Sequence, residues 1–353
     1  MNSALIIEGV VLILGFYFLG YKKPDISRKN YIFIIISLLI IESGLRAPTV
    51  GPDTMNYYSW FEDCKYLSWH SVFNNTSGDR DPGFSVVMKI CQLVSNDFNF
   101  FLTIGALWFF IPLGIILYRY SSHVLQLVFA FTLYLSLFHI IALSGIRQQF
   151  AMGFSFFAYL LFDKDKYILG SLLLIIGLTI HASLLLFTAV PVIHFFVNKK
   201  LYKPLHLLTL LSLPIIIVGA RIIIIRLAGL MSDDYYMSYS ETDNGGGVVY
   251  VALMELLSLF CFIAIKRDHL EKNLLISYLY INLPLMTFFV PMILVDGGLI
   301  RMGQYFTLYM MLLFPYAIDL FAGKKNRWIL YLISILILVV FISRSSIEYE
   351  FCF

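Results

Sequence analysis

Apolar runs long enough to cross a bilayer follow one another through almost the whole chain of 353 residues. A bilayer core requires roughly 20 apolar residues per helix, and the backbone polar groups of each span must be satisfied internally. Hydrophobic residues make up 60% of the sequence and charged residues only 13%, against about 25% charged in soluble domains. The chain therefore cannot hide its apolar surface in a globular core, and an all-α polytopic membrane protein is expected.

The hydropathy pattern predicts about twelve transmembrane helices in a single domain, 1–353. The expected spans are 4–21, 30–45, 98–118, 124–142, 146–162, 166–180, 182–197, 203–219, 248–265, 272–292, 302–322 and 327–343. Two larger segments, 46–97 and 220–247, lie between spans. An extra span within 82–96, or a single span across 166–197, would change the side on which the termini lie.

Lysine and arginine are divided unequally between the two sides of this topology. Cytoplasmic loops hold an excess of both, so the basic connections 22–29, 119–123, 163–166, 198–203, 266–272 and 323–327 are assigned to the cytoplasm. The two larger segments then face the periplasm. The other side holds two lysines and seven arginines, at positions 46, 80, 147, 221, 226, 301 and 344. The arginines are either interface residues or parts of a site for a phosphorylated lipid-linked substrate, since the guanidinium fork suits phosphate oxygens.

The two outer segments combine carboxylates with aromatic rings. In 46–97 the aromatic residues include Tyr57, Tyr58 and Trp60, and in 220–247 they include Tyr235 and Tyr236. Rings beside carboxylates and amides are suited to binding sugars, although single aromatic residues at an interface are more often belt residues. Arg221 and Arg226 lie among aliphatic residues, where a helix in the interface is the alternative to pyrophosphate binding.

Several polar side chains fall at the predicted outer ends of spans. Arg147 begins one span, Arg301 begins another, and His181 lies at the turn between two short spans. Each alone is compatible with a hydrogen-bonded structural residue. Because ionisable residues at membrane depth are costly and tend to be functional, their common level favours a shared cavity.

Motifs for several other chemistries are missing. HExxH, GxSxG, Walker and GxGxxG patterns do not occur, and four widely spaced cysteines give neither a disulfide framework nor a zinc site. The net charge of +3 is spread along the chain, so a nucleic acid is not an expected partner. Asp163 and Asp165 fit a charge-balanced turn, which leaves Asp79-Arg80-Asp81 as the outward DxD-like run.

Short motifs along most of the chain resemble one family. LRAPTVGPDTMNYYSWF resembles the Arg-x(n)-Gly-x-Asp-x(2)-Asn-Tyr-Tyr stretch of EpsG-type proteins, which are grouped with Wzy O-antigen and exopolysaccharide polymerases. RDPGFSVVMKI resembles their Glu-Pro-Gly-Phe block, with Asp81 in place of Glu. SGIRQQFAMGF, IHASLLLF and RMGQYFTLYMM resemble the Ile-Arg-Gln block, the His-containing block and the late Arg-containing span.

The resemblance implies a GT-C-like membrane glycosyltransferase in the bacterial inner membrane, acting at its periplasmic face. It would transfer a glycan from undecaprenyl diphosphate to another lipid-linked repeat unit, with no cofactor and no metal, and a chain-length co-polymerase is a possible partner. The implied roles are diphosphate binding by Arg147, Arg301, Arg46, Arg80 and Arg221, acid–base chemistry by Asp53, Asp81 and His181, and glycan binding by Tyr57, Tyr58, Trp60, Tyr235 and Tyr236. Arginines can stabilise the leaving diphosphate directly.

Three alternative functions remain open: two that involve the same lipid-linked substrates, and a purely structural one. A lipid-linked oligosaccharide flippase binds the same lipid, but would be expected to carry charges through the depth of a central cavity. An O-antigen ligase differs in its acceptor, lipid A core. A multispanning scaffold is the third alternative.

Overall fold

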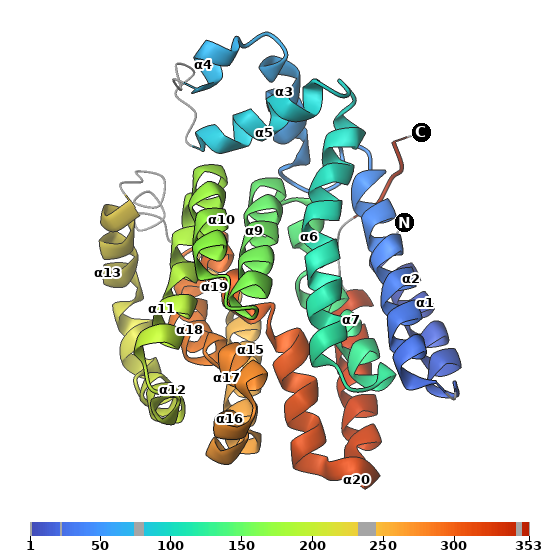
Figure 1. Ribbon diagram of the computed structural model, residues 1–353, viewed down its shortest axis with the longest axis vertical. Coiled ribbons are helices and arrows are strands. Elements are labelled where there is room, and N and C mark those ends of the chain that lie inside the picture. Colours follow the sequence, from blue (N-terminus) through green and yellow to red (C-terminus); the bar gives the residue numbers. More distant parts are fainter. Residues whose placement is uncertain (1, 22, 74–80, 232–244, 344–347, 353) are drawn as a thin grey trace. The chain divides into compact units, whose positions relative to one another are not determined.

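The structure, a computed structural model, describes residues 2–21, 23–73, 81–231, 245–343 and 348–352. Helices account for all the regular elements in these ranges, apart from one isolated β-bridge between Arg46 and Phe351. The chain divides into two compact units (Figure 1). Unit 1 comprises Met1–Leu184 and Ile329–Phe353, and unit 2 comprises Leu185–Trp328. The all-helical class expected from the sequence is thus confirmed over the described ranges.

Three helical stretches in the described ranges are long and apolar enough to cross a membrane: Phe98–Tyr120, Ile276–Leu294 and Met310–Ser343. A fourth is obtained if the pair Lys199–Leu211 and Leu213–Leu227, bent by 78°, counts as one broken span. Five further apolar helices have 10–17 residues. At 1.5 Å per residue, those helices fall short of the roughly 30 Å hydrocarbon core unless flanking residues complete them.

Unit 1 begins with a row of antiparallel helices. Its helices are α1 (Ser3–Leu19), α2 (Pro24–Gly44), α3 (Thr54–Cys64), α4 (Trp69–Phe73), α5 (Pro82–Gln92), α6 (Phe98–Tyr120), α7 (Val124–Leu137), α8 (His139–Leu143), α9 (Ile146–Phe162) and α10 (Tyr167–Ile180). Helix α1 packs on α7 and α2, α2 packs on α6, α6 packs on α9, and α9 packs on α10. The start of α2 follows from its sequence, because Pro24 occupies the first turn and Asp25 complements the helix dipole.

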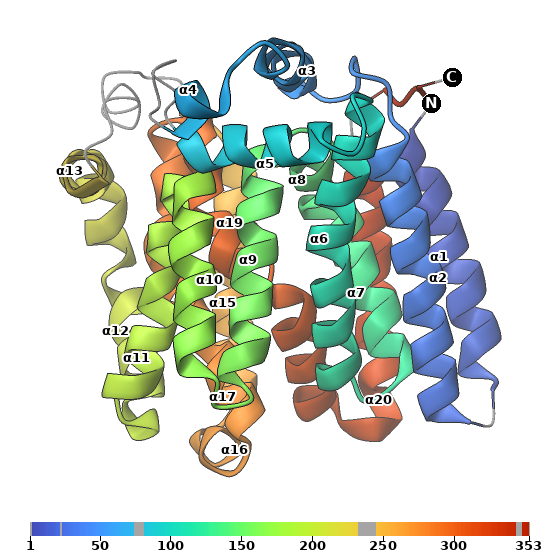
Figure 2. The ribbon, with the colours of Figure 1, turned by 45° about the horizontal axis from the view of Figure 1, so that its top comes forward.

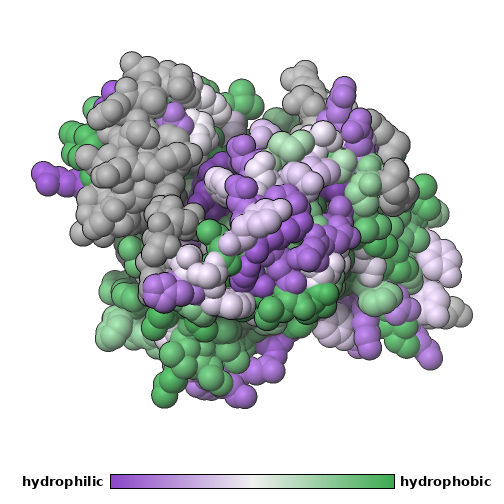
Figure 3. Space-filling model, turned by 90° about the horizontal axis from the view of Figure 1, so that it is seen from above, coloured by the Kyte–Doolittle hydropathy of each residue, from purple (hydrophilic) through white to green (hydrophobic). Residues whose placement is uncertain are grey.

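The three short helices of segment 46–97 form a layer over one end of this row. Figure 2 shows α5 lying crosswise over the ends of α9 and α10, and α5 packs against α10, α3 and α4. A column of stacked rings joins this layer to the row, since Phe101 lies 5.3 Å from Phe61 and 5.4 Å from Phe150. Viewed from above in Figure 3, the face that carries α3 to α5 displays hydrophilic side chains.

Helix α5 also satisfies the C-terminal carbonyl groups of α3. Lys89 Nζ donates to the carbonyl oxygens of Cys64 and Lys65 at 3.0 and 3.1 Å, and Gln92 Nε2 donates to that of Phe61 at 2.6 Å. These carbonyls have no partner within their own helix, so a cation and an amide from α5 replace water there. With only 11 residues, α5 is a layer element and not the extra span considered for 82–96.

Unit 2 contains shorter and more often interrupted helices. They are η1 (Ala182–Thr188), whose first residues belong to unit 1, α11 (Ala189–Phe196), η2 (Lys199–Leu201), α12 (Tyr202–Leu211), α13 (Leu213–Met231), α15 (Val248–Ala264), α16 (Arg267–Lys272), α17 (Leu274–Tyr280), α18 (Asn282–Phe289), η3 (Val290–Leu294), η4 (Gly297–Leu299) and α19 (Ile300–Thr307). Helix α20 (Met310–Ser343) begins in unit 2, breaks at Gly323 with φ 64° and ψ 177°, and continues into unit 1.

A buried chain of polar side chains ties four helices of unit 2 together, namely α12, α15, α17 and α18. His206 of α12 contacts Tyr280 Oη at 2.9 Å and Ser258 Oγ of α15 at 2.8 Å, and Ser258 contacts Thr287 Oγ1 of α18 at 2.8 Å. His206, Ser258 and Thr287 are fully buried. Each finds a partner within the unit, which is what a polar group away from water requires.

A close backbone contact fixes α5 on α10 and yields a test. A Cβ atom added to Gly83 would lie 2.8 Å from the carbonyl carbon of Thr179. We expect Gly83→Ala to destabilise the protein by about 1–3 kcal/mol, the usual cost of overpacking, as measured by thermal unfolding in detergent. Gly9→Ala is the matched control, because nothing lies within 4 Å of that site. Equal stability of the two variants would contradict the contact.

Candidate functional site

Asp81 lies at the junction between segment 46–97 and helix α5, directly before Pro82. A residue that precedes proline is restricted to extended conformations, and Asp81 has φ −122° and ψ 78°. The side chain is only 3% exposed and does not cap its own helix. The carboxylate is thereby turned toward the neighbouring helices of unit 1.

The first partner of Asp81 is Arg147, in the first turn of α9. Arg147 Nη1 donates to Asp81 Oδ2 at 2.7 Å, and the arginine side chain is 16% exposed. Helix α9 begins after Gly145, which offers no capping side chain, so its partly positive N-terminus adds to the positive potential near the carboxylate. Two charges that leave water must be paired, which locks α5 to the start of α9.

The second partner is His181, the residue that ends α10. Its φ of −156° takes the chain out of the helix, and its Nδ1 atom lies 3.6 Å from Asp81 Oδ2. The backbone N–H of Ala182 points to Asp81 Oδ1 at 3.4 Å. The 3.6 Å separation is too long for a hydrogen bond but short enough for an ion pair with a protonated imidazole. Asp81 thus joins an arginine and a histidine from two other segments.

Two aromatic rings of α3 complete the cluster around Arg147. The guanidinium carbon lies 5.1 Å from the centre of the Trp60 ring and 5.8 Å from that of Tyr57. Tyr57 is buried, whereas Trp60 is 43% exposed. Such rings stabilise a guanidinium over their faces, and they present a flat apolar surface beside it. The four side chains around Arg147, namely Asp81, His181, Tyr57 and Trp60, were all candidates from the sequence.

Two other candidates of unit 1 make contacts with different residues. Asp53 precedes α3 and donates its backbone N–H to Ser144 Oγ at 3.1 Å, which fixes the loop. Gly51 makes that loop possible, because its φ is +88° and a Cβ atom would lie 3.0 Å from the carbonyl carbon of Leu143. Tyr58 packs edge-on against Phe98 at 5.3 Å.

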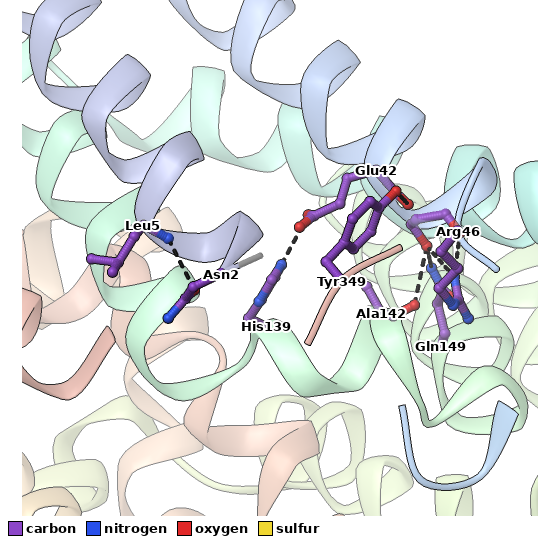
Figure 4. A network of polar contacts seen from close by, with 9 residues as sticks. Asn2, Leu5, Glu42, Arg46, His139, Ala142, Gln149 and Tyr349 are labelled. Carbon is purple, nitrogen blue, oxygen red and sulfur yellow. Dashed lines mark hydrogen bonds and ion pairs between the residues drawn. The ribbon is translucent and has the colours of Figure 1, made fainter. Parts of the chain in front are cut away.

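Arg46 belongs to a second polar group in unit 1, which is enclosed. The residue is 0% exposed, and its Nη1 atom donates to the Ser43 carbonyl and, at 3.1 Å, to Ser43 Oγ. Beside it His139 Nε2 contacts Glu42 Oε2 at 2.9 Å, and Tyr349 Oη donates to the Glu42 carbonyl at 2.8 Å (Figure 4). Burial lowers the pKa of Arg46 to about 10, so the guanidinium stays charged at neutral pH.

Unit 2 holds Arg301 and Arg221, which the family resemblance assigned to diphosphate binding. Arg301 is half-buried in the first turn of α19, following Asp296, whose Oδ1 accepts the Gly298 N–H at 2.8 Å. Arg221 is exposed on α13 and lines a cavity of about 350 Å³ with Gly245, Gly246, Val248, Leu294 and Val295. Arg80, Tyr235 and Tyr236 lie outside the described residues.

Sequence reasoning singled out neither Glu42 nor Tyr349. A signal for Glu42 was present, because an acid within the apolar run that ends at Ser43 is costly unless partnered. No local sequence pattern indicates a role for Tyr349, since its hydrogen-bond partner Glu42 lies 307 positions away. No three His, Cys, Asp or Glu side chains in the described ranges come together in an arrangement suited to a metal ion.

These features define a helical membrane protein with a carboxylate–arginine–imidazole cluster at the ends of its helices. Among known protein families, the EpsG family matches residues 29–352 of the chain. The chain belongs to the EpsG family, a family of Wzy-like polymerases and exopolysaccharide biosynthesis proteins, and the resemblance noted from its motifs is confirmed. No curated protein and no solved structure matches the chain significantly.

A double-mutant cycle tests the ion pair at the centre of the cluster. Asp81→Asn should lower the free energy of unfolding by roughly 3 kcal/mol, because it removes the carboxylate that pairs with the largely buried Arg147 charge. The double variant with Arg147→Gln should lose less than the sum of the single variants. The exposed pair Arg267–Glu271 is the control, where Glu271→Gln should cost little. Strictly additive losses at Asp81 and Arg147 would show that the two side chains do not interact.

Proposed function

We propose that this protein polymerises O-antigen or exopolysaccharide repeat units that are carried on undecaprenyl diphosphate. The observation that carries the proposal is the Asp81–Arg147–His181 cluster in a chain of the EpsG family. A partly exposed guanidinium suits an anionic leaving group, and a neighbouring imidazole suits proton transfer. We also propose that the chain crosses the inner membrane with about twelve spans in a GT-C-like arrangement. The cluster would then lie at the periplasmic face.

In the proposed reaction, the acceptor sugar hydroxyl attacks the anomeric carbon of the donor glycan. A C–O bond forms there, and the bond from that carbon to the diphosphate oxygen breaks. The hydroxyl proton passes to His181, which Asp81 orients at 3.6 Å, and polyprenyl diphosphate leaves against Arg147. The leaving group is already a stable anion, so the arginines supply the stabilisation and no metal is required. Trp60 and Tyr57 would contact the sugar rings nearest the diphosphate.

Arg301 is proposed as a further diphosphate ligand. Arg147→Ala and Arg301→Ala should each abolish polymer while leaving membrane insertion intact. The lysine variants should recover only part of the activity, because an ammonium cannot bind two phosphate oxygens as a planar fork does. Polymer yield from whole cells and the amount of inserted protein are the two measurements.

Arg267→Ala is the matched control for these arginine variants, since the Arg267 side chain is 52% exposed and pairs with Glu271 one turn along α16. It should retain full activity. Normal polymer from both Arg147→Ala and Arg301→Ala would remove the two arginines from the site.

The activity itself is tested in a strain that lacks the gene, with and without complementation. Surface polysaccharide run on a gel should show single repeat units without the gene and a ladder with it. Loss of all surface units, with lipid-linked units retained inside, would instead identify a flippase. Polymer that stays on its lipid carrier and never reaches lipid A core would identify a ligase.

A further inference from the structure

Residues 348–352, here called the strap, pair with the chain that follows α2. The Ala47 N–H donates to the Glu350 carbonyl at 3.0 Å, and the Cys352 N–H donates to the Leu45 carbonyl at 3.0 Å. Arg46 and Phe351 form the antiparallel bridge between these two hydrogen bonds. In this register residue 45 lies opposite residue 352.

One side chain anchors the strap. Tyr349 is 4% exposed and packs against Val50 and Leu143, while its hydroxyl reaches the Glu42 carbonyl. Figure 4 shows its ring beside Glu42, between His139 and Arg46. The other strap contacts are peripheral: Thr49 Oγ1 donates to Glu350 Oε2 at 3.2 Å in an exposed position. The strap is therefore held mainly by the Tyr349 anchor and by backbone hydrogen bonds, which water competes with once they are exposed.

The strap closes over a guanidinium whose donors are not all used. Arg46 Nε and Nη2 are buried and have no hydrogen-bond partner. Glu42, the nearest carboxylate in this group, is engaged through Oε2 by His139, and no ion pair joins it to Arg46 in the described part of unit 1. A buried cationic group with unsatisfied donors is costly, so it gains most from an anion with several acceptor oxygens.

Neighbouring groups add donors on the same side. Ser43 Oγ donates to the Ala142 carbonyl at 3.0 Å and is approached by Gln149 Nε2 at 3.4 Å. Gln149 lies in the first turns of α9, two residues beyond Arg147, so this enclosed group and the Arg147 cluster share one helix. The titratable groups that face Arg46 are Glu42, Tyr134 and Tyr349.

We propose that the strap shuts a second diphosphate site at Arg46, and that its release opens this site to the second lipid-linked substrate. The inference rests on the proposed function, since a polymerase must hold two lipid diphosphates where a hydrolase holds one. Closed, the strap covers Arg46 and places Tyr349 beside it. Open, the strap leaves both orphaned nitrogens accessible to phosphate oxygens.

A disulfide lock tests this directly. Leu45→Cys places a thiol opposite the exposed native Cys352, with the buried Cys64, Cys91 and Cys261 replaced by alanine. Directly opposed residues in an antiparallel pair have the Cα separation that a disulfide needs. The same protein carrying Cys352→Ser, which cannot form the bond, is the matched control.

Binding of farnesyl diphosphate to the purified protein in detergent is the measurement. The reduced protein and the control should bind about two equivalents, and the oxidised protein about one. Arg46→Gln should bind about one in both redox states. Inorganic pyrophosphate, measured in parallel, separates a lipid site from a site for free anions, because only the former requires the prenyl chain.

Equal stoichiometry in the oxidised and reduced forms would overturn the strap proposal, whatever the polymerase activity. Failure of the proposed function is seen separately, as loss of the ladder from the complemented strain. If disulfide formation lowers the number of bound farnesyl diphosphate molecules by one, the strap proposal is supported even when the complemented strain shows no ladder. Retention of two equivalents by reduced Arg46→Gln would place the second site elsewhere and contradict the assignment.

Discussion

The ion pair between Asp81 and Arg147 is the contact on which the proposed site depends. It links the loop before α5 to the start of α9 at 2.7 Å, and the same carboxylate holds His181 at the end of α10. Because both charges are largely removed from water, moving either segment away would break the pair at a cost in free energy. Three segments that are distant in the sequence are thereby brought to one point, with Tyr57 and Trp60 over the guanidinium.

Two other groups of buried polar side chains among the described residues form networks of their own. His206, Ser258 and Thr287 join α12, α15 and α18 in unit 2, and Glu42, His139 and Tyr349 join α2, α8 and the strap in unit 1. The first network is satisfied internally, as a structural core requires. The second leaves Nε and Nη2 of Arg46 without hydrogen-bond partners, and the proposed second diphosphate site rests on this observation.

Much of the cluster was predictable because its residues stand at the ends of apolar runs. Arg147 and His181 could be singled out there, whereas Asp81 was singled out in the outward Asp79-Arg80-Asp81 run. The positions of α6 and α9 agree with the hydropathy pattern. Hydropathy averages over a window, so it could not reveal the layer of α3 to α5 or the 78° bend between α12 and α13. Arg46 was expected to bind diphosphate, yet it lies fully enclosed, because the strap that covers it pairs with residues about 300 positions away, a contact that leaves no periodic signal.

In the proposed reaction, polyprenyl diphosphate leaves against Arg147 as each linkage forms. The most direct measurement uses purified protein in liposomes with a lipid-linked repeat unit, and counts released polyprenyl diphosphate and new glycosidic bonds together. We expect one lipid diphosphate to be released for each bond, and neither product to form with Arg147→Gln. Bond formation without release, or unchanged turnover in Arg147→Gln, would contradict it.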